Sequence, residues 1–90
     1  MLEKTFKITN QTGLDAKMAS TIVTFSSKFN CDITLQINTL SVNLKSIMGV
    51  MSLNVHKGEL VKVICNGIDE EEAINKLATA INETKLGKEY

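Results

Sequence analysis

The sequence has no proline, no tryptophan, one tyrosine and one histidine among its 90 residues. Ten Lys or Arg residues balance ten acidic residues, so the formal net charge is zero. Modules that bind nucleic acid normally carry an excess of basic residues on one face. The even charge and the scarcity of aromatic side chains for base stacking therefore argue against direct nucleic-acid binding.

Long apolar runs are also missing. No stretch approaches the roughly 18 residues that a membrane span needs, and no basic segment followed by an apolar run marks a signal peptide. We therefore expect a cytoplasmic protein that does not enter a membrane. Cys31 and Cys65 form no recognisable motif, and a cytosolic chain would keep them reduced as small apolar side chains. With 43% hydrophobic residues, the chain is expected to fold as one domain over residues 1–90.

Strand and helix periods alternate along the first half of the chain. Residues 2–9 alternate as a strand, with Lys4 as the exception on its apolar face. A helical period runs over 16–29, and Asp15 lies where a side chain caps a helix. Two further strands, 33–37 and 40–44, read as a hairpin.

The second half adds a short helix, a strand and a long helix. The segment 46–53 reads as the short helix, with three side chains expected to face the core: Ile47, Val50 and Met51. Residues 60–65 form a strand, and Asp69 with Glu72 resembles a capping box before the last helix. That helix has a clear apolar stripe of Ile74, Leu77, Ala78 and Ile81, and Gly87 is expected to end it.

The resulting order is βαββαβα, which predicts an α+β fold. We expect an open-faced β-sandwich with a four-stranded antiparallel sheet and three helices on one face. No metal site is expected, because His56 has no ligand-type residue at a suitable spacing. No phosphate-binding glycine loop and no cofactor motif is present.

Two helix starts remain as candidate sites, because helix N-termini attract anions. Asp15 lies at the first and Ser46 at the second. The segment from Leu44 to Leu53 reads LKSIMGVMSL, and with the element order it resembles the HPr family, the phosphocarriers of the bacterial sugar phosphotransferase system. In particular, it resembles the regulatory serine region of the family in low-GC Gram-positive bacteria.

The first helix start departs from the family motif. Asp15 occupies the position of the phosphorylated histidine, Lys17 that of an arginine and Met18 that of a proline. This combination is similar to Crh-like members, which lack the histidine and keep the serine. The resemblance implies a non-enzyme without histidine phosphocarrier activity. It implies Ser46 phosphorylation by HPr kinase/phosphorylase, followed by corepression with a LacI-type catabolite control protein. The chain is then expected to be a monomer or weak homodimer.

The residues expected to contact partners are Asp15, Lys17, Ile47, Met48 and Met51. Asp15 keeps three interpretations: a helix cap, a permanent charge that imitates the phosphorylated state, or an aspartyl-phosphate acceptor. Ser46 is either only a cap or also a regulated serine. Two other functions stay open, namely a divergent phosphocarrier that uses Asp15 and a partner-binding protein that only kept the fold.

Overall fold

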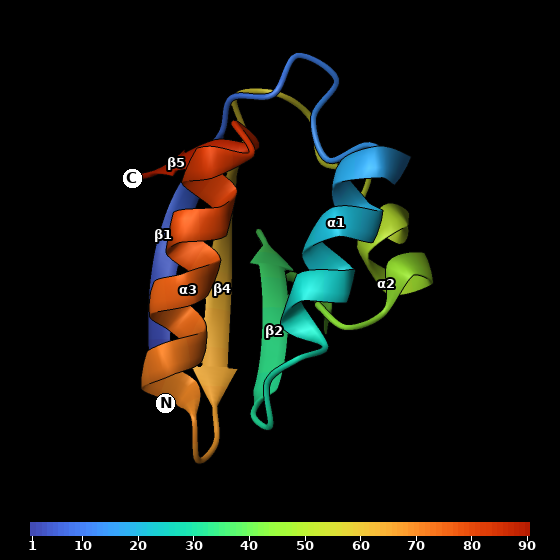
Figure 1. Cartoon of the computed structure of the whole chain (residues 1–90). Helices are drawn as coiled ribbons and strands as arrows, with labels where there is room; N and C mark the ends of the chain where they lie inside the picture. Colours follow the sequence, from blue (N-terminus) through green and yellow to red (C-terminus); the bar gives the residue numbers. More distant parts are fainter.

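Five strands form one antiparallel sheet, and three helices cover one of its faces (Figure 1). The computed structural model describes all 90 residues. The strands are ordered β3-β2-β4-β1-β5 across the sheet. In chain order the elements are β1 (Leu2–Ile8), α1 (Ala16–Ser26), β2 (Asp32–Ile37), β3 (Leu40–Asn43), α2 (Ile47–Ser52), β4 (Leu60–Asn66), α3 (Glu70–Glu83) and β5 (Gly87–Glu89).

The open-faced α+β fold with three helices is confirmed, but the expected four-stranded sheet was wrong. Gly87 does not end the last helix; it begins β5, which pairs antiparallel with β1. A side chain on Gly87 would place its Cβ 2.6 Å from the Lys7 carbonyl oxygen, so only glycine allows this approach. The extra strand also explains Lys4 on the apolar face, because its ammonium lies 3.5 Å from a Glu89 carboxylate oxygen.

The expected capping box at the start of α3 is also wrong. The Asp69 side chain does not cap the helix, because it accepts a hydrogen bond from the Asn30 backbone N–H at 2.7 Å. The Glu70 carboxylate instead binds groups outside the helix: it accepts from the Gly67 N–H at 3.0 Å and pairs with the Met1 ammonium at 2.7 Å. The carboxylate therefore joins the start of α3 to the start of β1.

The core lies between the sheet and the helices. The stripe predicted on α3 is confirmed, since Ile74, Leu77 and Ile81 are buried against the inner face of the sheet. On α1 the helix ends at Ser26, one turn earlier than expected, and the chain continues in tight turns to the buried Phe29. None of the three helices is long and apolar enough to cross a membrane.

Both cysteines are free and buried in this core. Burial, followed by the nearby Asp69 carboxylate, raises the pKa of the Cys31 thiol to about 12. Burial also raises the pKa of Cys65. Because the thiolate is the nucleophile, we expect neither cysteine to react in the folded protein.

We therefore expect the native protein to react with Ellman's reagent at least about tenfold more slowly than the chain unfolded in guanidinium, since attack needs an exposed thiolate. The absorbance of the released thiolate over time measures both rates. A native rate equal to the unfolded rate for either Cys31 or Cys65 would show that the thiol is accessible in the folded protein.

Candidate functional site

Asp15 caps α1 with its own carboxylate. Its Oδ1 accepts a hydrogen bond from the Met18 backbone N–H at 2.9 Å, and Oδ2 accepts one from the Thr12 hydroxyl. The bond from Thr12, then that from Met18, and the nearby Lys17 charge hold the pKa of Asp15 below its ordinary value. Asp15 is therefore an ionised group that occupies the anion-attracting start of the helix itself.

The loop before Asp15 is fixed by the segment that follows α2. The Leu14 N–H donates to the Val55 carbonyl at 3.1 Å. Gly13 has a φ of 68°, and a Cβ there would lie 2.3 Å from the same Val55 oxygen. His56, the next residue, is exposed and places Nδ1 3.5 Å from a Glu59 carboxylate oxygen. No group of three or more His, Cys, Asp or Glu side chains is arranged to hold a metal ion.

Ser46 is the N-cap of α2. Its hydroxyl accepts a hydrogen bond from the Gly49 N–H at 3.1 Å, and its carbonyl accepts from the Val50 N–H at 3.0 Å. The side chain is half-buried. The Ser46 side chain packs closely against Gly49, because a Cβ at position 49 would lie 3.3 Å from the Ser46 hydroxyl oxygen.

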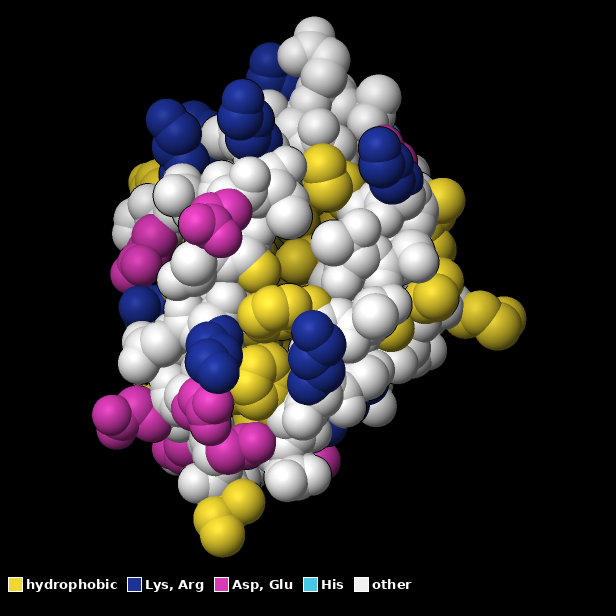
Figure 2. Space-filling view, viewed as in Figure 1, with side chains coloured by type: hydrophobic (Ala, Val, Ile, Leu, Met, Phe, Trp, Pro, Cys, Tyr) yellow, Lys and Arg dark blue, Asp and Glu magenta, His cyan; other side chains and the backbone are white.

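Most of the apolar side chains of α2 lie in solvent. Met48 is 84% exposed, Ile47 46% and Met51 39%, whereas Val50 is buried. The expectation that Ile47 and Met51 face the core was therefore wrong. The reason is that α2 packs on α1 and β3 at the side of the helical layer, so only one position is enclosed. Figure 2 shows hydrophobic side chains gathered on the surface over α2.

The two helix starts do not form one site. Asp15 begins α1, whereas Lys45, the neighbour of Ser46, donates from Nζ to the Phe29 carbonyl at 2.7 Å, just beyond the end of α1. A helix of this length spans about 16 Å at ~1.5 Å per residue. The helix α2 lies beside α1 and runs between the two regions (Figure 1).

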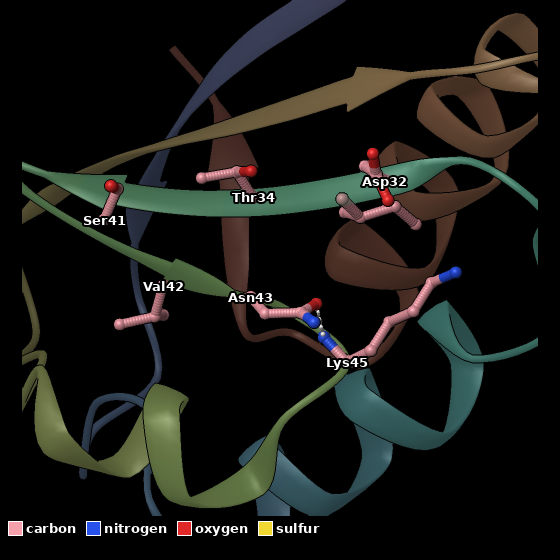
Figure 3. Close-up of a pocket in the computed structure, with 7 residues that line it drawn as sticks. Asp32, Thr34, Ser41, Val42, Asn43 and Lys45 are labelled. Carbon is pink, nitrogen blue, oxygen red and sulfur yellow. Dashed lines mark hydrogen bonds between the residues drawn. The ribbon is translucent and has the colours of Figure 1, made fainter.

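A hollow of about 420 Å³ lies over the paired strands β2 and β3, next to the turn that leads into Ser46 (Figure 3). The Lys45 N–H donates to the Asn43 side-chain oxygen at 2.9 Å and so fixes the turn that leads into Ser46. Sequence patterns gave no indication of this hollow, nor of Thr12, Gly49 and Lys45 as partners of the two sites. The residues that line the hollow are Asp32, Ile33, Thr34, Ser41, Val42, Asn43 and Lys45.

The fold and the two capped helix starts define a small open-faced α+β domain. The family model described as the PTS HPr component phosphorylation site matches residues 2–83. The chain belongs to the HPr family, as the sequence resemblance implied. HPr proteins carry phosphoryl groups for the phosphotransferase system.

Solved structures agree with this assignment. The histidine-containing phosphocarrier protein from Mycoplasma has a TM-score of 0.92 at 32% identity, covering 96% of this chain and 98% of that chain. HPr-C-His from Thermoanaerobacter tengcongensis has a TM-score of 0.87 at 45% identity, covering 96% of each chain. Crh from Bacillus subtilis, a catabolite repression protein solved as an intertwined swapped dimer, has a TM-score of 0.73 at 40% identity, covering 92% of this chain and 95% of that chain.

Proposed function

We propose that this protein is a Crh-like regulator of carbon catabolite repression that acts in the cytoplasm. HPr kinase/phosphorylase phosphorylates it on Ser46, and the modified protein is a corepressor for a LacI-type catabolite control protein. The observation that carries the proposal is the segment LKSIMGVMSL, in which Ser46 is the N-cap of an exposed apolar helix. The similarity to Crh, a catabolite repression protein, supports it.

A phosphate on Ser46 fits the local structure. It carries about −1.5 to −2 charges and three acceptor oxygens, and it would replace the hydroxyl as acceptor for the Gly49 N–H. Helix starts favour negative charge, so the modification changes the surface without unfolding α2. The fold therefore persists in both states, and the switch is local.

The docking surface in this proposal combines charge with apolar contact. Arginine side chains of the repressor bind the phosphate, because Arg–phosphate pairs are often bidentate and charge-assisted. Ile47, Met48 and Met51 supply apolar contacts beside it, and methionine adapts well to a partner surface. Asp15 and Lys17, at the start of α1, contribute charged contacts at the other end of this docking surface. The protein works as a monomer or a weak homodimer.

In this proposal the histidine relay is absent. Asp15 replaces the required imidazole, and its carboxylate is already bonded to Met18 and Thr12. Phosphoenolpyruvate and the general phosphotransferase enzyme should therefore not label this protein, whereas an HPr with the active histidine is labelled in the same reaction. Transfer of radioactive phosphate, followed by gel analysis, measures this.

An acid-labile phosphate on His56 would contradict the absence of a relay, and an acyl phosphate on Asp15 would favour the divergent phosphocarrier. Replacing Asp15 by histidine should restore only weak labelling, because Lys17 and Met18 also depart from the family motif.

Incubation with ATP and HPr kinase/phosphorylase tests the proposal. We expect mass spectrometry to find one phosphate, on Ser46. The Ser46→Ala variant should remain unmodified, while Ser52→Ala should be modified like the natural chain, because Ser52 lies at the other end of the same helix. Full modification of Ser46→Ala, or none of the natural chain, would leave Ser46 as a plain cap and favour a protein that only kept the fold.

A further inference from the structure

The face of the sheet opposite the helices carries two lysines in adjacent strands. Lys7 of β1 pairs in register with Lys88 of β5 on one side and with Leu60 of β4 on the other. Lys7 lies between Phe6 and Ile8, both buried under the helices, so its side chain points to the open face. Its register partners share that face, and the three side chains therefore form one row across three strands.

Nothing in the protein neutralises the two lysines. Side chains directly opposite each other have Cβ atoms about 4.5–5.5 Å apart, and like charges in this position destabilise a sheet. Neither Lys7 nor Lys88 forms an ion pair. Two carboxylates on the same strands are already engaged, Glu89 with Lys4 and Glu3 with Lys62 at 3.4 Å. Two like charges that face each other in a sheet without an ion-pair partner depart from the usual pairing of side chains. Departures of this kind are typical of functional surfaces.

The row ends at an exposed apolar side chain, Leu60, beside a mostly polar depression. Leu60 is 41% exposed, and a depression of about 230 Å³ lies next to it on the open face. Lys62, which pairs with Thr5, stands on its rim. Four of the depression's six lining residues are polar, so the apolar contact that this face offers is Leu60 itself, while the unpaired ammonium groups of Lys7 and Lys88 attract negative charge. The residues that line it are Thr5, Gln36, Asn38, Leu60, Val61 and Lys62.

We propose that the open-face surface formed by Lys7, Leu60 and Lys88 binds an acidic segment of a partner protein. Carboxylates of the segment pair with the two unpaired ammonium groups, and one apolar side chain packs on the exposed Leu60. A peptide is favoured over a membrane, because lipid recognition uses clusters of about 4–8 basic residues and this surface has only the pair Lys7 and Lys88 without ion-pair partners. The surface is separate from Asp15 and Ser46, which lie on the helical side, so both surfaces can be occupied together.

The proposed binding is tested by titrating the full chain with the peptide acetyl-Glu-Glu-Leu-Glu-Glu-amide. Nuclear magnetic resonance monitors the amide signals of the protein during the titration. We expect amide shifts confined to the open-face surface and none with the peptide in which glutamine replaces glutamate. The Lys7→Gln/Lys88→Gln variant should bind about three- to tenfold more weakly, as expected for two exposed ion pairs. Lys28→Gln/Lys76→Gln, which removes the same charge from the helical side, should bind like the natural chain.

Equal weakening by both double variants, or shifts spread over lysines throughout the chain, would overturn the proposal, since attraction would then be unspecific. Vesicles of phosphatidylglycerol provide the second arm. Binding of vesicles that depends on Lys7 and Lys88, without binding of the peptide, would also overturn it and assign the surface to a membrane. Unchanged core resonances in the variants exclude misfolding as the cause.

Discussion

Replacing Leu77 by alanine should lower the free energy of unfolding by ~2–5 kcal/mol, the usual cost of truncating a buried leucine. Leu77 is fully buried and lies at the centre of the apolar stripe of α3, between Ile74 and Ile81. Its removal leaves a cavity where α3 meets the sheet. Chemical denaturation followed by circular dichroism gives the free energies of the natural chain and the variant.

Asn75→Gln on the exposed side of α3 is the matched control, and it should change the free energy of unfolding by no more than about 0.5 kcal/mol. A loss below about 1 kcal/mol for Leu77→Ala would mean that the α3 stripe is not part of the core, because only exposed positions tolerate truncation so well.

Gly13→Ala should be comparably destabilising. The left-handed backbone at Gly13 costs any residue with a Cβ about 1–2 kcal/mol, and the contact with the Val55 oxygen at 2.3 Å adds roughly 1–3 kcal/mol for the forced shift. The free energy of unfolding should therefore fall by about 2–5 kcal/mol, as the sum of the two terms. Denaturation of the variant measures the loss.

Gly58→Ala separates the two terms. Gly58 also has a positive φ, of 92°, but nothing lies within 4 Å of an added Cβ. Its loss should be limited to the backbone cost of about 1–2 kcal/mol. If both variants lost the same free energy, the loop that holds Asp15 would not be packed against the Val55 segment.

Periodicity was sufficient to predict most of the fold. The stripe on α3 and the hairpin of β2 and β3 are long enough for a repeat to identify the element and its buried face. The fifth strand was missed because three residues cannot show a period. Gly87 was interpreted as a helix end, although its role is a close approach to β1.

The sites were predictable only in part. Asp15 and Ser46 could be placed at helix starts, because caps act over three residues of local sequence. The exposure of Ile47 and Met51 could not be predicted, since it depends on where α2 sits in the helical layer. The pairing of Lys7 with Lys88 depends on the missed fifth strand, so no pattern within one segment could reveal it.

The final expectation concerns the regulatory switch itself. Phosphorylation of Ser46 should raise affinity for the catabolite control protein by at least about tenfold, since hydrogen bonds to charged groups contribute ~1.5–3 kcal/mol. Ser46→Asp should imitate this poorly, because a carboxylate has less charge and fewer acceptor oxygens than phosphate. Met48→Asp should weaken docking without blocking phosphorylation, since Met48 is the most exposed apolar side chain of α2.

Calorimetric titration of the repressor with unmodified and Ser46-phosphorylated protein is the most direct measurement. We expect tight binding of the phosphorylated form, weak binding of the unmodified form, and no gain for Ser46→Ala after incubation with kinase and ATP. Equal affinities for the two forms of the natural chain would contradict a phosphorylation switch at Ser46 and reduce that residue to the cap of α2.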